Sequence, residues 1–458
     1  MSRPELPRAV PRAVPRAVPR AVPALARFVA WLFYRLERTG DAVPEGPVLL
    51  VANHPNALLD PSLVWATAGR DIRFLAKSTL FAGNVLAPLI RRSGAIPVYR
   101  RTDEGSDLSR NAEMFAAVGA ALSQGDAVCL FPEGKSHSSG RLEDLRTGAA
   151  RIALAAAAEG IPLKIVPIGL NLNRKAVFRS RATALYGRPF GVDDLLDLFA
   201  RDPAAAVAAL TDRIAERLRA LIVEADPRSD AQLVERVERL YAAARGVPAD
   251  PRDRIERSQI IARGVERLRS ADAGRYEAIR ERVRAYDALI ARFGLRDRDI
   301  GQSVAMWTAA RFAVRELALA ALLVPVVIGG AVLHLIPYLV TDSVVRVSRP
   351  SFDVRATVKA LAGCVFYPLW YVVLATFAWR RIDPWLGGAV VLLMPLLAIT
   401  TLFAVEREWA VARAVRAYLA ARRLPRPVHS RLKRSRAEIA EVLEQVYEWL
   451  NVEAPQQP

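Results

Sequence analysis

Short apolar runs alternate with helix-like stretches between residues 46 and 191. The apolar runs predict five strands, at Val48–Ala52, Ile72–Ala76, Ala95–Tyr99, Ala127–Phe131 and Leu163–Leu170. Helices are expected between them, for example at Leu108–Ser123 and Gly148–Ala158. Strands separated by helices indicate an α/β domain with a mixed or largely parallel sheet flanked by helices. Ligands of such sheets bind beyond the carboxyl ends of the strands.

The residues before this domain show two different patterns. Residues 1–23 contain four copies of Arg-Ala-Val-Pro, and proline at every fourth position predicts a disordered segment. Within residues 24–45, apolar side chains such as Phe28, Leu32 and Leu36 recur at helical spacing. This spacing predicts an amphipathic helix that either lies at a membrane interface or packs on the domain core.

The residues after the domain are expected to be helical and to end in a membrane region. Residues 192–315 are rich in alanine, arginine and glutamate and predict a helical arm. Residues 316–405 contain three apolar segments of about twenty residues, the length of a spanning helix. Because Pro325, Gly329 and Gly330 interrupt the first segment, we expect it to be re-entrant. Residues 406–458 predict a basic juxtamembrane tail followed by an amphipathic helix.

The net charge indicates which partner the protein binds, and the spacing of its cysteines and histidines bears on whether it binds a metal. A formal net charge of +18 indicates an anionic partner, either membrane phospholipid or nucleic acid. The apolar segments favour phospholipid, and no nucleic-acid-binding motif supports the other choice. The two cysteines and four histidines do not have the spacing of a metal site, so no metal is expected.

A histidine and an aspartate directly after the first strand are the candidate catalytic pair. The imidazole of His54 is suited to take a proton from a hydroxyl, and the carboxylate of Asp60 is suited to orient that ring. Six positions are too many for one helix face, so the segment must turn, and Pro55 and Asn56 are turn formers. Asp60 also fits a helix N-cap, because proline follows it.

The segment Phe131–Ser136 supplies candidate substrate-binding residues after another strand. Glu133 is suited to hold a substrate hydroxyl, and Gly134 permits a tight turn that brings backbone amides to a ligand. Lys135 and Ser136 are candidates for contact with phosphate. Two basic residues at other strand ends, Lys77 and Arg100, are further candidates for binding phosphate.

Four blocks together resemble the phospholipid/glycerol acyltransferase superfamily, which includes the lysophosphatidic acid acyltransferases. They are Asn53–Asp60, Gly94–Arg100, Phe131–Gly134 and Val166–Ile168, in the order and at the spacing of that family. Five residues separate His54 from Asp60 where four are usual, and this longer spacer resembles the branch related to fungal glycerol-3-phosphate acyltransferases.

The resemblance implies a glycerolipid-acyltransferase-like fold and a membrane-bound enzyme. It implies direct transfer of a fatty acyl group from acyl-CoA or acyl carrier protein to lysophosphatidic acid, with His54 and Asp60 as catalytic residues. No cofactor is implied, and the location implied is a bacterial-type inner membrane with the site on the cytoplasmic side. The candidate substrate-binding residues are Asn53, Lys77, Arg100, Glu133, Gly134, Lys135 and Ser136. Of these, the resemblance implies that Arg100 and the Glu133–Gly134 turn hold the phosphate and glycerol of the acceptor.

The sequence is also compatible with other functions, and it does not determine the oligomeric state. The acceptor is alternatively glycerol-3-phosphate or another lysolipid, and a membrane adaptor without activity is a candidate from a different class. A serine hydrolase is disfavoured because Ser78 and Ser136 do not lie in a Gly-x-Ser-x-Gly elbow. His137 adjoins Ser136, but the sequence shows no evident acid to orient it.

Overall fold

The computed structural model describes residues 21–81, 87–99, 111–225, 228–247, 250–297, 300 and 306–452. The chain divides into two compact units. The first contains residues up to 228 together with 250–259 and 352–357, and the second contains residues 229–249, 260–351 and 358–458. The two units are described separately.

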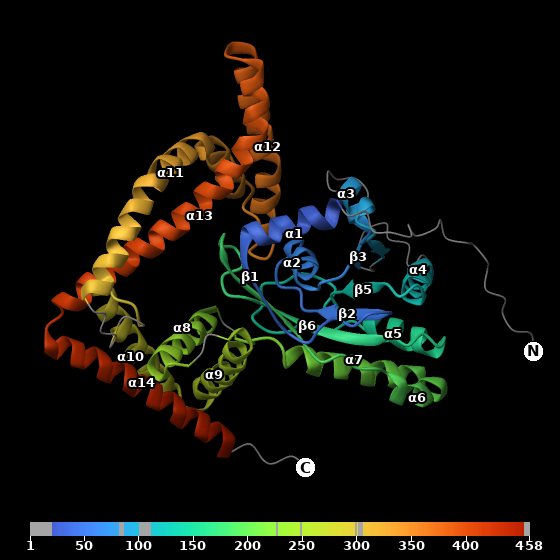
Figure 1. Ribbon diagram of the computed structural model, residues 1–458. Helices are drawn as coiled ribbons and strands as arrows, with labels where there is room; N and C mark the ends of the chain where they lie inside the picture. Colours follow the sequence, from blue (N-terminus) through green and yellow to red (C-terminus); the bar gives the residue numbers. More distant parts are fainter. Residues whose placement is uncertain are drawn as a thin grey trace, which may run out of the picture. The chain divides into compact units, whose positions relative to one another are not determined.

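The first unit is built on a seven-stranded sheet with the strand order β1-β7-β6-β2-β5-β3-β4 (Figure 1). Strands β6 and β7 run antiparallel, and every other neighbouring pair is parallel. The strands are β1 (Tyr34–Gly40), β2 (Val48–Ala52), β3 (Ile72–Lys77), β4 (Ile96–Val98), β5 (Ala127–Leu130), β6 (Lys164–Leu172) and β7 (Ser180–Tyr186).

The centre of this sheet is apolar on both faces. All five residues of β2 are buried, and Leu50 lies opposite Cys129 of β5 and Val166 of β6. Continuous apolar strands are typical of parallel sheets that are covered on both sides. Because β2 and β5 are parallel, their carboxyl ends meet at one edge, and His54 and Glu133 follow directly after them.

Helices cover both faces of the sheet. On one face α4, α5 and α7 contribute to a single hydrophobic core with β2, β5 and β6. Figure 1 shows α1 and α2 on the other face. The predicted α/β class is therefore confirmed. The helices of this unit are α1 (Ala21–Phe33), α2 (Leu59–Thr67), α3 (Ala87–Arg92), α4 (Asn111–Ser123), α5 (Gly148–Ala158), α6 (Leu196–Arg201) and α7 (Pro203–Arg219).

The five strands predicted from apolar runs are all present, with ends that differ by one or two residues. Helix α5 has the predicted bounds, and α4 ends where predicted. Residues 1–20, most of the segment predicted to be disordered, lie outside the described residues.

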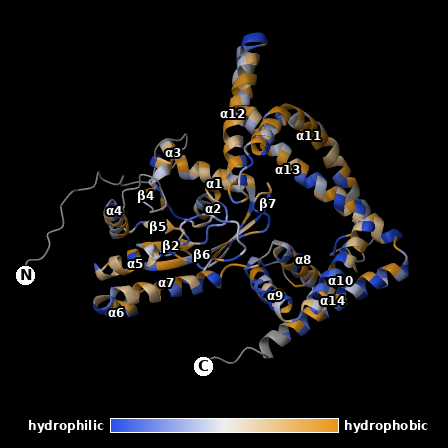
Figure 2. Ribbon diagram, turned by 180° about the vertical axis from the view of Figure 1, so that it is seen from behind, coloured by the Kyte–Doolittle hydropathy of each residue, from blue (hydrophilic) through white to orange (hydrophobic). Residues whose placement is uncertain are grey.

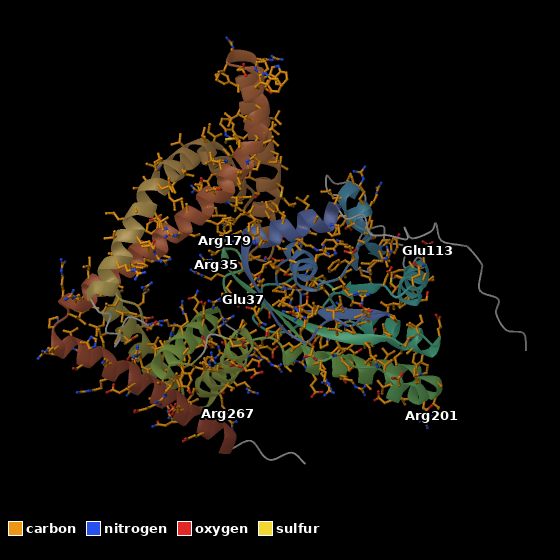
Figure 3. All side chains as sticks on the ribbon, viewed as in Figure 1. Arg35, Glu37, Glu113, Arg179, Arg201 and Arg267 are labelled. Carbon is orange, nitrogen blue, oxygen red and sulfur yellow. The ribbon has the colours of Figure 1, made fainter. Side chains whose placement is uncertain are left out.

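The helix predicted within residues 24–45 is wrong beyond Phe33, where α1 ends and β1 begins. Tyr34 is fully buried and opens a parallel pairing with β7. The last carbonyls of α1 accept hydrogen bonds from Arg179, whose backbone N–H lies 2.6 Å from the Phe33 oxygen and whose guanidinium donates to Trp31 at 2.9 Å. Figure 3 places Arg179 near Arg35 of β1. Leu36 continues the helical spacing of apolar residues in the sequence. Residues Tyr34–Gly40 are nevertheless extended, because they pair with β7.

Two helices of the predicted arm belong to the sheet unit. Leu210, Ile214 and Leu218 of α7 are buried in the core beneath the sheet. The segment after α7 approaches β6 so closely that a Cβ on Gly169 would lie 2.2 Å from the Leu221 carbonyl oxygen. The compact sheet unit thus extends past residue 191.

The second unit is helical. It contains most of α8 (Arg228–Arg245), the larger part of α9 (Pro251–Ala271), and α10 (Ala273–Arg292) and α14 (Arg426–Val452). These four helices meet around an apolar pocket lined by residues such as Val237, Leu268 and Val446. Arg236 of α8 joins this bundle to Asp287 and Asp297 through ion pairs of 2.6 and 2.8 Å.

Three further helices of this unit are long and apolar enough to cross a membrane. They are α11 (Met306–Ser348), α12 (Arg355–Arg381) and α13 (Pro384–Arg423). Only 11%, 6% and 17% of their most apolar windows are buried inside the protein. Figure 2 shows hydrophobic residues along α11 and α12. Apolar surface of this extent matches a lipid environment, so the predicted membrane helices are present.

The first of these helices is not broken in its middle, where the sequence predicted an interruption, and its re-entrant course stays a prediction. Helix α11 runs continuously through Pro325 and Pro337. Gly330 faces α13, and a Cβ there would lie 1.8 Å from Thr401 Oγ1. Small residues of this kind let two membrane helices approach closely. The glycine that suggested a break therefore serves helix packing.

Two glycine-to-alanine variants test the packing of α7 against the sheet. We expect Gly169→Ala to destabilise the protein by about 1–3 kcal/mol, because the new methyl group meets a backbone carbonyl. Gly119→Ala in α4 is the matched control, since its Cβ meets open space. That variant gains about 1 kcal/mol from helix propensity. Thermal unfolding in detergent checks both, and equal unfolding temperatures for the two variants would contradict the close approach.

Candidate functional site

The candidate catalytic pair is in contact. His54 Nδ1 lies 2.8 Å from Asp60 Oδ2. The Asp60 side chain is fully buried, whereas the His54 side chain keeps 16% of its surface exposed. The imidazole stacks on the Phe131 ring, with centroids 4.1 Å apart. This stacking and the Asp60 contact fix the plane of the ring.

A tight turn brings the two side chains together. Ala57 adopts a left-handed conformation with φ of 45°, and the Asn56 N–H donates to Asp60 Oδ2 at 2.6 Å. Helix α2 begins at Leu59, and Leu58 occupies its N-cap position without a side-chain cap. Asp60 therefore lies inside the first turn, and its carboxylate binds the preceding loop instead of capping the helix.

The contact with Asp60 relates the proton on His54 to the charge of the carboxyl group. An ionised carboxylate can only accept hydrogen bonds, so Nδ1 carries hydrogen when Asp60 is charged. Nε2 is then the basic nitrogen. Burial raises the pKa of the Asp60 carboxyl, and the hydrogen bonds from His54 and Asn56 oppose that rise.

Glu133 connects the two sequence blocks. Its carboxylate is 2% exposed, and Oε1 accepts the His54 backbone N–H at 2.6 Å. Oε2 accepts the Glu143 N–H at 3.0 Å and also binds the His137 ring. Both oxygens are thus occupied by protein donors. The role predicted for Glu133, binding of a substrate hydroxyl, stays a prediction.

His137 is a second histidine of this site. Its Nε2 binds Glu133, and its Nδ1 lies 3.9 Å from Glu143 Oε1. Burial by itself lowers the pKa of His137, but the Glu133 hydrogen bond and the charges of both glutamates outweigh burial and the nearby Lys175. The pKa of His137 is therefore raised above 6.5, and its charged form is stabilised.

Lys175 ties the two loops together from the side of β6 and β7. Its Nζ donates to the Pro55 carbonyl at 2.7 Å and to the His137 carbonyl at 2.9 Å. The Lys175 carbonyl accepts the Tyr34 hydroxyl at 2.5 Å, and Tyr34 in turn accepts from Asn56 Nδ2 at 2.5 Å. This buried network holds the turn that carries His54.

The remaining predicted residues lie at different places around this centre. Asn53 exchanges hydrogen bonds of 3.1 and 2.7 Å with the Leu170 backbone, so its amide links β2 to β6. Lys135 is exposed and pairs with Glu143 at 2.9 Å. Lys77 is the last residue of β3.

Two other residues of the third block have defined neighbours. Gly134 has φ of 75°, and its alpha carbon faces the Arg146 side chain. Ser136 Oγ donates to Asp353 at 2.8 Å. Arg100 lies outside the described residues. Among the described residues, no group of three or more His, Cys, Asp and Glu side chains is placed to hold a metal ion.

The sequence did not predict the roles of several side chains at this site. The acid that orients His137 is Glu133, and the four-residue spacing between them was an available signal. Tyr34 and Lys175 carried no such signal, because both reach the site only through the pairing of β1 and β7 at the sheet edge.

Comparison with known proteins identifies the domain that holds this pair. A family model described as "Acyltransferase" matches residues 35–171, which include His54, Asp60 and Glu133. Residues 35–171 therefore match an acyltransferase domain, which is consistent with the resemblance of the motifs to the phospholipid/glycerol acyltransferase superfamily.

The individual relatives align over parts of their length. Glycerol-3-phosphate O-acyltransferase 2 of Saccharomyces cerevisiae is 32% identical over 29% of this chain and 18% of its own length. Glycerol-3-phosphate O-acyltransferase 1 of the same yeast is 26% identical over 58% and 37%. The 1-acyl-sn-glycerol-3-phosphate acyltransferase of Streptococcus pneumoniae is 27% identical over 32% and 51%. The chain therefore spans about a fifth to a half of these relatives.

A solved structure also aligns with this chain. The crystal structure of the 1-acyl-sn-glycerophosphate (LPA) acyltransferase PlsC from Thermotoga maritima aligns with a TM-score of 0.32 and 18% identity. The alignment covers 44% of this chain and 79% of that chain.

The raised pKa of His137 predicts how stability depends on pH. A folded-state pKa above the unfolded value gives stability that is complete below about pH 6.5 and is lost as pH rises through the folded pKa. We expect the unfolding temperature of the wild type to fall over that range and His137→Gln to lack this part of the fall. His429→Gln in α14 is the control and should keep the wild-type slope. Equal slopes for wild type and His137→Gln would contradict the pairing with Glu133.

Proposed function

We propose that this protein transfers a fatty acyl group from a thioester donor, acyl-CoA or acyl carrier protein, to a hydroxyl of a glycerophosphate acceptor. The observation that carries the proposal is the 2.8 Å contact between His54 Nδ1 and the buried Asp60 carboxylate. It lies at the carboxyl end of β2, within a domain of the acyltransferase family. An imidazole that is oriented in this way presents Nε2 as a base.

The reaction follows from that geometry. His54 Nε2 accepts the proton of the acceptor hydroxyl while the oxygen attacks the thioester carbonyl carbon. The resulting tetrahedral intermediate collapses, its carbon–sulfur bond breaks, and the thiolate takes the proton from the imidazolium. Asp60 stabilises the positive charge on His54 between these two steps. No acyl-enzyme is formed, and no cofactor is required.

The membrane helices support an acceptor or product that resides in a lipid bilayer. Helices α11, α12 and α13 would keep the enzyme at the surface where lysolipid is found. The proposal includes membrane phospholipids as partners and a bacterial-type inner membrane with the site on the cytoplasmic side. Basic residues such as Arg422, Arg423 and Arg426, which follow the apolar part of α13, support that side.

Lysophosphatidic acid is the proposed acceptor, and glycerol-3-phosphate is the second candidate. Both present a free hydroxyl beside a phosphate group, so the same base serves either. The second candidate is favoured by the two yeast relatives, whose names state glycerol-3-phosphate acylation. The first is supported by the name of the streptococcal relative.

The base assignment predicts the effect of removing His54. We expect His54→Ala to lower kcat by about 100- to 10,000-fold, the usual contribution of a general base. Incorporation of labelled acyl groups into lipid by purified protein measures this loss. His429→Ala serves as a matched histidine control and should retain wild-type turnover. Wild-type turnover by His54→Ala would refute the proposed mechanism.

A comparison of acceptors identifies the substrate. Purified enzyme receives labelled acyl-CoA with lysophosphatidic acid or glycerol-3-phosphate in parallel, and mass spectrometry identifies the product. We expect phosphatidic acid from the first acceptor at a higher kcat/KM than lysophosphatidic acid from the second. The reverse order would assign the enzyme to glycerol-3-phosphate. Absence of both products, with either acyl-CoA or acyl carrier protein as donor, would favour the adaptor without activity.

A further inference from the structure

A short segment between two membrane helices belongs to the catalytic unit. Residues 352–357 follow the end of α11 at Ser348 and include the first residues of α12, which begins at Arg355. They nevertheless pack within the first unit. Ala356 and Thr357 are buried there. The segment is therefore a fixed part of the acyltransferase unit, although it is more than 180 residues beyond the matched family domain.

The first contact of this segment is with the third sequence block. Asp353 Oδ2 accepts a hydrogen bond from Ser136 Oγ at 2.8 Å. Ser136 adjoins His137, whose ring binds Glu133. A hydrogen bond to a charged acceptor is stronger than one between neutral groups. Asp353 thus contacts the loop that follows Glu133.

The second contact is with Lys175. The Lys175 ammonium lies 5.2 Å from the centroid of the Phe352 ring, within the range of a cation–π interaction. The same ammonium donates to the Pro55 and His137 carbonyls. Phe352 therefore contacts a side chain that joins the loop of His54 to the loop of Glu133. By excluding water, the ring strengthens those hydrogen bonds.

We propose that Phe352 and Asp353 are positioning residues for acyl transfer, which hold the loops 54–60 and 133–137 in their reactive arrangement. The proposal rests on the proposed function. The atoms they contact lie one residue from His54 and within the block predicted to bind the acceptor. A general base must be held within hydrogen-bonding reach of the hydroxyl that it deprotonates, so a small displacement of either loop reduces turnover.

A double-mutant cycle tests the Ser136–Asp353 bond. We expect Ser136→Ala and Asp353→Ala each to lower kcat/KM for the acceptor by about tenfold. Because both remove one shared bond, the double variant should lose about tenfold as well. Asp353→Asn keeps an oxygen acceptor for Ser136 and should recover much of the activity. Phe352→Tyr, which keeps the ring, should be more active than Phe352→Leu.

Control variants and a stability measurement separate positioning from folding. Asp194→Ala removes a carboxylate from an exposed ion pair with Arg213 in the same unit and should retain wild-type kinetics. Each variant is compared at equal amounts of folded protein, as judged by its thermal unfolding. If Asp353→Ala does not fold, the Asp353→Asn and Phe352 variants carry the test.

The outcomes distinguish this proposal from the proposed function. Wild-type kcat/KM in Asp353→Ala and Phe352→Leu, while His54→Ala is inactive, overturns the positioning role alone. A loss of about a hundredfold in kcat/KM when Ser136→Ala and Asp353→Ala are combined also overturns the positioning role, since the effects of independent substitutions multiply. Wild-type turnover by His54→Ala overturns the proposed function and this proposal together.

Discussion

The buried carboxylate of Glu133 holds the site together, because it binds three donors from two loops of the chain. It accepts the backbone N–H of His54, the backbone N–H of Glu143 and the ring of His137. A buried carboxylate without donors is costly, so these partners are required wherever Glu133 is ionised. Protonation of His137 lowers that cost. The result is that the loop after β2 and the loop after β5 are fixed to each other at one edge of the sheet.

The sheet makes this contact possible by placing two loops side by side. Strands β2 and β5 are adjacent and parallel, so the residues that follow them begin at neighbouring positions. Strands β1 and β7 extend the sheet on the other side and bring Tyr34 and Lys175 to the same loops. The His54 ring is thereby held by Asp60, by Phe131 and, through its backbone, by Glu133. Orientation of this kind is what a general base requires.

The connection between helices α11 and α12 contacts residues of the candidate site. The connection between α11 and α12 places Asp353 on Ser136 and Phe352 on Lys175. The family model ends at residue 171 and therefore does not include Phe352 or Asp353. The connection between two of the long apolar helices therefore contributes to the surroundings of His54.

The sequence by itself determined five of the seven strands, the membrane helices and the His54–Asp60 pair, because local apolar patterns and short motifs encode them. It did not determine the end of α1 at Phe33, the continuity of α11 or the role of Lys175. Each of these depends on a partner far away in the chain: β7 pairs with β1, Thr401 packs on Gly330, and the Pro55 and His137 carbonyls receive Lys175. Long-range pairing of backbone and buried polar groups leaves no local pattern, so only the tertiary structure decides it.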